Sequence, residues 1–484
     1  MLRKLNRKWI IAAIIFLAVS IRFYKINMPL LEGCVARQIF CADVSRNMYR
    51  DGEFLKPKLS LLPEPRLYLG ECPIYCSLVS IVYKIIGDVK EVWGRIITII
   101  SFVVGMILLY LIVREFSDEK IALISMSVFS LLPVGIIYGK SFQPDQLSVT
   151  FGLLAIYLIM LWTKKDKLLY FFISIACLII GSLTKLTTLS ILLTALAIVV
   201  LRKEKRSLPY FIVYSVLVIT GISPWLLYIY NHKNLVIAAY TDAFSFSKWL
   251  SFERLLSYGY YKEMFLLLSG VVLTPIGFSL FLLGLILKNR KKEECIFYIW
   301  LISAFLPFVF LNKKFGTHWF LLPLPVLSYF VGKAVCNMKT VLDSVSSNKY
   351  YRCIFTVGLV IYLWGYINCG FIYPHTVKNT LSISKIVKEK TEFEDLICTD
   401  AGVDLLYYSD RKGYSIWRDE KGNIKEKDID TMFISEIERL KREGVDYLII
   451  SRIDEYKSRP FLKEYIENNC ELVEKKDICL IYKL

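Results

Sequence analysis

The chain has 484 residues, of which 55% are hydrophobic, and a formal net charge of +17 at pH 7. Its mean hydropathy of +0.49 is above that of soluble domains, and several apolar runs approach the roughly 20 residues that a transmembrane helix needs. A soluble enzyme is therefore excluded. Because much of the positive charge lies in short connections between apolar runs, it indicates membrane orientation and no nucleic-acid partner.

The apolar runs, taken in chain order, predict about eleven transmembrane helices. The N-terminal stretch MLRKLNRKW precedes the first run. Because no small-residue cleavage site follows it, we expect an uncleaved first helix and not a signal peptide. The predicted spans are residues 9–25, 92–113, 119–139, 146–163, 168–184, 186–201, 209–230, 263–287, 295–311, 318–336 and 352–372.

Lysine and arginine residues are concentrated in every second connection of this predicted bundle. They crowd the segment before the first span and the connections after the second, fourth, sixth, eighth and tenth spans. The positive-inside rule assigns these connections to the cytoplasm. We therefore expect a multi-pass protein of the cytoplasmic membrane with a cytoplasmic N-terminus. The segment 26–91 (the first outer segment) and the tail from about residue 374 are predicted to be extracytoplasmic.

Both predicted outer regions carry further structure. Residues 73–87 (PIYCSLVSIVYKIIG) are amphipathic and too short for a span, so we expect them to lie in the membrane interface. The tail predicts a small α/β domain, with strands at 395–400, 446–452 and 478–484 and a helix at 428–444. The expected fold class is thus a polytopic all-α membrane protein with a C-terminal extracytoplasmic α/β domain. Its domains are residues 1–373, which include the first outer segment, and 374–484.

Charged and polar residues collect on the predicted outer side. Each of them taken singly is compatible with an interface anchor, because side chains at helix ends snorkel to water. Their cations are harder to explain together, because the positive-inside bias depletes lysine and arginine there. Such cations suit a phosphate, which arginine binds in a bidentate manner and lysine as a point charge. The candidate site residues are Glu32, Arg37, Gln38, Arg46, Glu71, Tyr75, Arg95, Asp145, Lys185, Lys313 and His318.

Glycosyl transfer from a lipid-linked phosphosugar requires such an arrangement. The phosphate of the donor is a good leaving group, so one carboxylate as base and cations for the departing phosphate are sufficient. A single displacement inverts the anomeric centre and needs no second carboxylate nucleophile. No organic cofactor is implied. The absence of a DxD-like acidic cluster on the outer side argues against a metal, although a divalent ion is left open.

The same residues resemble those of the C-superfamily glycosyltransferases, in the branch of protein O-mannosyltransferases and of the aminoarabinose transferases that modify lipid A. The resemblance extends from about residue 5 to 335 and includes an Arg-Gln variant of the first-loop motif. The matching positions are Arg37-Gln38 with Arg46-Asn47, Glu71-x-Pro73-x-Tyr75, Trp93 and Arg95, Pro144-Asp145, Lys185, and His318-Trp319. It implies a polyprenyl-phosphate sugar donor, membrane lipids as partners, and a lipid, glycan or protein acceptor.

Two departures from the family pattern affect the site assignment. Arg37-Gln38 replaces the usual acidic pair, and Cys72 follows Glu71 where a basic residue is common. We therefore predict Glu32 as the base, with Asp145 second or else orienting the sugar or acceptor. The predicted phosphate-binding residues are Arg37, Arg46, Lys185, Lys313 and His318, with loop geometry as the alternative role of the first two. The predicted substrate-binding residues are Gln38, Glu71, Tyr75 and Arg95.

Two other functions stay open at this point. A transporter or flippase of a lipid-linked saccharide is also polytopic, but it should show internal repeats and charges near the bilayer midplane. The sequence shows neither. A membrane scaffold whose tail binds a partner would explain the tail but not the polar cluster. The sequence defines neither the sugar nor the acceptor, and it leaves open whether Cys72 pairs with Cys76 or Cys470 with Cys479.

Overall fold

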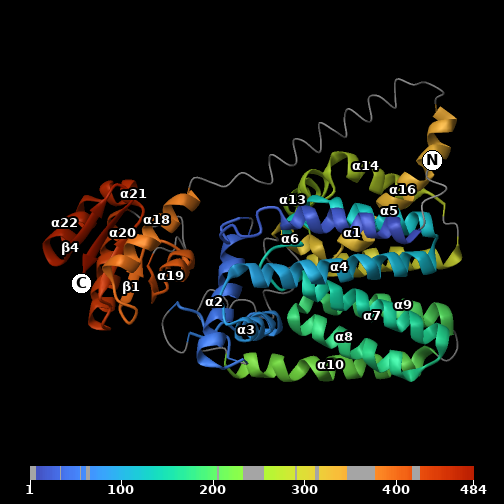
Figure 1. Ribbon diagram of the computed structural model, residues 1–484, viewed down its shortest axis with the longest axis horizontal. Coiled ribbons are helices and arrows are strands. Elements are labelled where there is room, and N and C mark those ends of the chain that lie inside the picture. The colour runs from blue at the N-terminus through green and yellow to red at the C-terminus, as the bar shows by residue number, and fades with distance from the viewer. Residues whose placement is uncertain are drawn as a thin grey trace. The chain divides into compact units, whose positions relative to one another are not determined.

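The structure is a computed structural model (Figure 1), and it describes part of the chain. The described residues are 7–32, 34–54, 56–61, 66–203, 207–232, 256–288, 291–310, 316–345, 376–416 and 426–484. The chain divides into two compact units. The helical unit comprises residues 1–28, 69–234 and 241–372, and the sheet unit comprises residues 29–68, 235–240 and 373–484.

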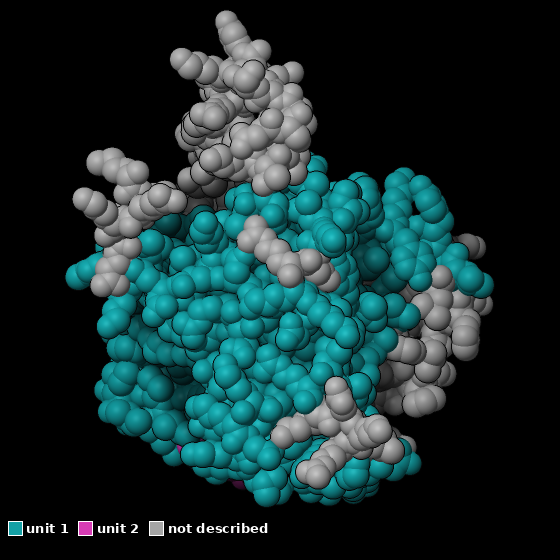
Figure 2. Space-filling model, turned by 90° about the vertical axis from the view of Figure 1, so that its right-hand side faces the viewer, with its two compact units in different colours: residues 1–28, 69–234, 241–372 teal, residues 29–68, 235–240, 373–484 magenta. Residues whose placement is uncertain are grey.

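Long apolar helices make up the helical unit, and the described atoms on the face in Figure 2 belong almost entirely to it. Its α-helices are α1 (Arg7–Phe23), α3 (Ile74–Ile86), α4 (Glu91–Phe116), α5 (Glu119–Leu131), α6 (Pro133–Tyr138), α7 (Asp145–Lys165), α8 (Leu168–Thr184), α9 (Ile191–Lys203), α10 (Ser207–Asn231), α13 (Tyr258–Leu266), α14 (Thr274–Ile286), α15 (Cys295–Phe310) and α16 (Leu324–Val345). Short 3₁₀ or π turns lie between some of them, namely η2 (Leu186–Ser190), η7 (Leu267–Val272), η8 (Lys292–Glu294) and η9 (Thr317–Leu321).

Each of the first ten predicted spans falls on one of these helices or on a pair of consecutive helices. The eleventh, residues 352–372, lies outside the described residues. Three described helices are long and apolar enough to cross a membrane by themselves, namely α4, α7 and residues Pro209–Asn231 of α10. A bent pair would add a fourth if it forms one span. Most of the amphipathic stretch 73–87 forms α3, and its place in the interface stays a prediction.

Two of the predicted spans are broken. The span at 119–139 is interrupted at Pro133, which lacks the N–H that an unbroken helix would use. There the guanidinium of Arg22 donates to the carbonyl oxygens of Ser130 (3.0 Å) and Gly135 (2.8 Å). The span at 263–287 is bent by 107° between Val272 and Thr274. Thr274 has φ of +69°, which is unusual for a β-branched residue and marks a sharp change of direction.

A buried ion pair joins η8 and α16 of this unit. Glu294 of η8 and Lys333 of α16 are both fully buried, and their charged atoms lie 3.9 Å apart. The Glu294 carboxylate also accepts hydrogen bonds from the hydroxyls of Ser117 (2.8 Å) and Tyr329 (3.2 Å). The Lys333 ammonium donates to the carbonyl oxygen of Leu287 at 2.8 Å. Each charge therefore has neutral hydrogen-bond partners in addition to the other charge.

The sheet unit contains a five-stranded sheet of order β2-β1-β3-β5-β4. Strands β2, β1 and β3 run parallel, whereas β5 pairs antiparallel with β3 and β4. The strands are β1 (Leu396–Thr399), β2 (Lys412–Ser415), β3 (Tyr447–Ile450), β4 (Glu471–Lys476) and β5 (Cys479–Lys483). The helices are α2 (Val35–Asp51), α18 (Thr376–Lys390), α19 (Val403–Ser409), α20 (Glu426–Arg442), α21 (Ile453–Lys457) and α22 (Pro460–Asn469).

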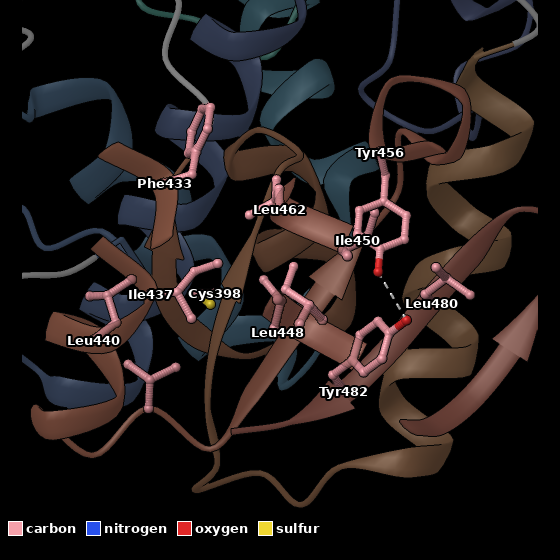
Figure 3. Close-up of a cluster of buried hydrophobic side chains, with 12 residues drawn as sticks. Cys398, Phe433, Ile437, Leu440, Leu448, Ile450, Tyr456, Leu462, Leu480 and Tyr482 are labelled. Carbon is pink, nitrogen blue, oxygen red and sulfur yellow. Dashed lines mark hydrogen bonds between the residues drawn. The ribbon is translucent and has the colours of Figure 1, made fainter. Parts of the chain in front are cut away.

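An apolar cluster between the sheet and its helices forms the core of this unit (Figure 3). Ile437 and Leu440 of α20 and Leu462 of α22 contribute to it together with side chains of β3 and β5. The hydroxyls of Tyr456 and Tyr482 lie 3.3 Å apart beside it. The predicted strands correspond to β1, β3 and β5 and the predicted helix to α20, so the α/β prediction for the tail is confirmed.

Part of the first outer segment belongs to the sheet unit. Leu61 forms a parallel bridge with Gly413 of β2, and the Gly413 N–H donates to the Ser60 carbonyl oxygen at 3.1 Å. The sequence did not predict α2, which occupies residues 35–51 of this segment. The predicted domain division at residue 373 stays a prediction. Neither candidate cysteine pair forms a disulfide in the described residues, since Cys72, Cys76, Cys470 and Cys479 are all thiols.

Candidate active site

The helical unit pairs two of the predicted site residues. Asp145 is the first residue of α7, and Lys185 directly follows α8, so the two antiparallel helices bring them to the same end of the hairpin. The Lys185 ammonium forms an ion pair with the Asp145 carboxylate. Asp145 is 1% exposed and Lys185 is 8% exposed. A carboxylate in the first turn of a helix is also favoured by the helix dipole.

Hydrogen bonds hold this end of the hairpin in place. The Ser148 hydroxyl of α7 donates to the carbonyl oxygen of Gly181 of α8 at 2.8 Å and lies 2.5 Å from the Thr188 hydroxyl. Gly181 lacks a side chain, and an added Cβ would lie 3.2 Å from atoms of α7, so the helices approach closely there. The backbone at Asp145 and Lys185 is therefore fixed by packing close to the ion pair.

Tyr75 supports the loop that leads to Asp145. Its hydroxyl donates to the Gly94 carbonyl oxygen at 2.8 Å, and its ring packs edge-on against Phe142 at 5.7 Å between centroids. The Phe142 ring lies over Gly94, in the space that a Cβ at that position would take. The Ser141 carbonyl oxygen accepts a hydrogen bond from the Thr98 hydroxyl at 2.9 Å. Tyr75 thus contacts the loop, and its predicted contact with substrate stays a prediction.

His318 is a buried residue of η9. Its ring packs against Tyr138 with centroids 6.0 Å apart, and the Tyr138 hydroxyl pairs with that of Thr317. The neighbouring Trp319 places its ring 5.8 Å from the Lys185 ammonium, a distance that suits a cation–π contact. The structure therefore brings Trp319 of η9 to Lys185, and His318 precedes Trp319 in the chain. Lys313 lies outside the described residues.

Arg95 and Glu71 lie in the same unit. The buried Arg95 guanidinium donates to the carbonyl oxygens of Ile26 (2.6 Å) and Met28, so it holds the chain that follows α1. Glu71 precedes Cys72, whose N–H donates to the Leu183 carbonyl oxygen at 3.1 Å. Glu71 is thus carried on a segment attached to the end of α8, two residues before Lys185. The substrate-binding roles of both residues stay predictions.

The other predicted site residues belong to the sheet unit. Gln38 is buried on α2, and its Nε2 donates to the Glu32 carbonyl oxygen at 2.6 Å. Arg37 lies on α2 next to Gln38, one turn from the start of the helix. The structure therefore brings Glu32 and Gln38 together, with Arg37 adjacent in the chain. These residues and Arg46 thus belong to a different unit from Asp145 and Lys185.

Arg46 is bound by protein groups on several sides. Its guanidinium forms ion pairs with Asp43 (2.8 Å) and Asp410 (2.9 Å) and donates to the Tyr407 carbonyl oxygen (2.8 Å). Burial tends to lower the pKa of Arg46, but the charges of Asp43 and Asp410 outweigh it and the pKa is raised. These contacts favour loop geometry over phosphate binding, the two alternatives that the sequence left open for this residue.

Sequence reasoning did not single out Gln143, which lies in the same KSFQPDQ stretch as Asp145. Gln143 is fully buried, and neither end of its side-chain amide has a hydrogen-bond partner within the described residues. A buried polar group without a partner is costly. Its position two residues before Asp145 was the only signal in the sequence.

The Asp145–Lys185 pair combines two groups that transfer chemistry uses. A carboxylate can accept a proton or orient a hydroxyl, and a lysine ammonium can bind a phosphate as a point charge. The described residues contain no group of three or more His, Cys, Asp or Glu side chains that could hold a metal ion.

Comparison with known proteins finds a family match over part of the chain. Residues 71–228 match the family described as dolichyl-phosphate-mannose-protein mannosyltransferase, a range that contains Glu71, Tyr75, Arg95, Asp145 and Lys185. No curated protein matches the chain in sequence.

Solved structures share the fold at low sequence identity. ArnT from Cupriavidus metallidurans, bound to undecaprenyl phosphate, superimposes with a TM-score of 0.65 at 13% identity, over 99% of this chain and 98% of ArnT. The archaeal oligosaccharyltransferase AglB from Archaeoglobus fulgidus, in complex with an inhibitory peptide and a dolichol-phosphate, gives 0.58 at 12% identity, over 96% of this chain and 71% of AglB. The mycobacterial arabinofuranosyltransferase AftD gives 0.60 at 12% identity, over 99% of this chain and 42% of AftD.

These comparisons confirm the fold class, a mostly helical membrane protein with a small C-terminal α/β part. They also confirm the resemblance to the C superfamily that the motifs indicated. The match of residues 71–228 to the family described as dolichyl-phosphate-mannose-protein mannosyltransferase, together with an ArnT-like fold over nearly the whole chain, indicates a multi-pass membrane glycosyltransferase.

Proposed function

We propose that this glycosyltransferase moves a sugar from a polyprenyl-phosphate donor to an acceptor on a lipid, glycan or protein, at the outer face of the cytoplasmic membrane. The buried Asp145–Lys185 ion pair is the observation that carries the proposal. Two proteins of the same fold were solved with such lipids, ArnT with undecaprenyl phosphate and AglB with a dolichol-phosphate, which supports this donor class.

The reaction is a single displacement. A carboxylate takes the proton of the acceptor hydroxyl or amine while the acceptor atom attacks the anomeric carbon of the donor sugar. The bond between that carbon and the phosphate oxygen breaks, and polyprenyl phosphate leaves with the bonding electrons. Since the acceptor attacks opposite to the leaving phosphate, the anomeric configuration inverts. Lys185 stabilises the charge that develops on the departing phosphate.

The proposal assigns different roles to the two carboxylates. Asp145 already contacts the Lys185 ammonium, so we assign it to orienting this lysine and the sugar. Glu32, whose backbone is held by Gln38, remains our candidate for the base. Asp145 is the second candidate for the base.

Transfer measured with purified protein in liposomes tests the proposal. Radiolabelled polyprenyl-phosphate sugars are offered together with native membrane acceptors to wild type and to Glu32→Gln, Asp145→Asn and Lys185→Met. The matched control is Asp166→Asn, at the opposite end of α7 from Asp145. We expect Glu32→Gln to lose turnover while it retains donor binding, Lys185→Met to weaken donor binding, and the control to match wild type.

The outcomes separate the alternatives. Loss of turnover with donor binding retained in Asp145→Asn alone would reassign the base to Asp145. Absence of transfer from every donor, together with movement of a lipid-linked saccharide across the vesicle membrane, would refute the transferase and support a transporter or flippase.

A further inference from the structure

A short helix of the C-terminal tail contacts the segment that carries Glu32. This helix, α19, spans Val403–Ser409, and the Tyr408 hydroxyl at its end accepts a hydrogen bond from the Leu30 N–H at 2.7 Å. Leu30 is fully buried and lies two residues before Glu32. Backbone immediately before Glu32 is therefore fixed by a residue of the tail.

Asp410, the residue that follows α19, makes a second contact with the first outer segment, at two arginines of α2. The Asp410 carboxylate accepts two hydrogen bonds of 2.8 Å from the Arg50 guanidinium and pairs with Arg46 at 2.9 Å. Burial tends to raise the pKa of Asp410, but the hydrogen bond from Arg50 and the charges of both arginines outweigh it and lower the pKa. Asp410 is consequently charged at neutral pH and holds both arginines.

Helix α2 links these two arginines to the backbone of Glu32. Arg46 and Arg50 lie in its C-terminal half, and Gln38 lies near its N-terminal end. Residues from Gln38 to Met48 are buried without interruption, so the helix is enclosed by other parts of the chain. Because the Gln38 side chain donates to the Glu32 carbonyl oxygen at 2.6 Å, a displacement of α2 would also displace Glu32.

We infer that Tyr408 and Asp410 are positioning residues for transfer, and that α19 fixes Glu32 from both sides, through Leu30 and through α2. The inference rests on the proposed function, in which Glu32 is the base. It makes the C-terminal tail a functional part of the transferase, since a base displaced by about 1 Å can lose a large part of its rate contribution.

Two substitutions remove these contacts with little other change. Tyr408→Phe deletes one hydroxyl. Asp410→Asn removes the charge but keeps a residue that tolerates the left-handed backbone found at this position, where φ is +56°. For both variants we expect kcat to fall about tenfold or more while the donor KM stays within about twofold of wild type, because the reacting geometry is lost and donor binding is not.

Matched controls lie in the same unit but do not contact α2 or Leu30. Tyr465→Phe deletes a hydroxyl that donates to Glu438 at 3.2 Å. Asp430→Asn breaks an ion pair with Arg459 at 3.2 Å, in which Asp430 is 6% exposed. Each control loses a polar contact of the same chemical kind away from the Glu32 segment, so we expect each to keep the kcat of wild type. Thermal unfolding of all four variants measures the purely structural cost.

A double variant adds a readout that a purely structural role would not affect. In the Glu32→Gln background, Tyr408→Phe should lower the remaining turnover no further, because the residue that it positions no longer acts as a base. Equal kcat in Tyr408→Phe and Tyr465→Phe, at equal folded fractions, would overturn the inference. Failure of wild type to transfer any sugar would instead overturn the proposed function, so the two failures are distinguishable.

Discussion

The burial of the Glu294–Lys333 ion pair predicts how much unfolding free energy is lost when one partner is removed. Both residues are fully buried, so removal of either leaves the other charge in a low-dielectric site. Breaking a buried pair from one side costs about 3–5 kcal/mol of unfolding free energy. We therefore expect Lys333→Met and Glu294→Gln each to destabilise the protein by an amount in this range.

The double variant should cost less than either single variant. The hydroxyls of Ser117 and Tyr329 bind the two oxygens of the carboxylate at 2.8 and 3.2 Å. Without the lysine, a glutamine at position 294 can accept from one hydroxyl through its amide oxygen and donate to the other hydroxyl oxygen through its amide nitrogen. No buried charge then remains, and replacing such a pair by neutral groups is often close to neutral. The two single effects should consequently be far from additive.

Equilibrium unfolding of the protein in detergent micelles measures this cycle. The control is the pair Lys385–Glu389 on α18, which has the same separation of 3.9 Å but side chains that are 80% and 58% exposed. Solvent screens such a pair, so its removal should leave stability nearly unchanged. Additive single effects at Glu294 and Lys333, or a double variant less stable than both singles, would refute the reasoning.

Two further predictions concern the stability of the protein at low pH and the packing of the loop before Asp145. The pKa of Asp410 is lowered in the folded protein, so its stabilising contribution is present above the ordinary aspartate pKa of about 3.9 and is lost as pH falls through the lower folded value. Unfolding measured against pH should therefore show a smaller loss of stability in acid for Asp410→Asn than for wild type, and parallel curves would contradict this. Gly94→Ala places a methyl group against the Phe142 ring and should cost about 1–3 kcal/mol by overpacking, together with reduced turnover. Gly270→Ala, where an added Cβ meets no atom within 4 Å, is the control in the same thermal-unfolding and transfer assays, and equal stability of the two variants would contradict the packing argument.

The sequence predicted the helices of the membrane region well because the bilayer imposes long apolar segments. It did not predict the 107° bend before Thr274, although Pro275 follows Thr274 directly and a proline inside an apolar run marks a break in the helix. It also missed α2. This helix is buried around its whole circumference between Gln38 and Met48 although it is rich in polar residues, so it shows neither an apolar stripe nor an apolar run.

The candidate site was predicted in part. Sequence order and a common predicted side indicated that Asp145, Lys185 and His318 belong together. The structure pairs Asp145 with Lys185 and places Trp319, which follows His318 in the chain, near Lys185. The partners of individual arginines could not be predicted, because a guanidinium that binds backbone carbonyls has the same sequence signature as one that binds phosphate. Arg46 and Arg95 both contact protein groups in the structure, and their predicted roles toward substrate stay predictions.

The contact between α2 and α19 has a consequence for how the protein is made. Arg50 and Asp410 lie 360 residues apart in the chain, so the ribosome completes the early half of the sheet unit long before the late half exists. Until then, α2 cannot bury the polar residues that Asp410 and its neighbours later enclose. Such distant contacts form slowly and leave intermediates exposed to aggregation and proteolysis. A chain that stalls or is truncated before residue 403 would therefore carry an unprotected α2, which quality-control proteases can recognise at the N-terminal end of an otherwise inserted protein.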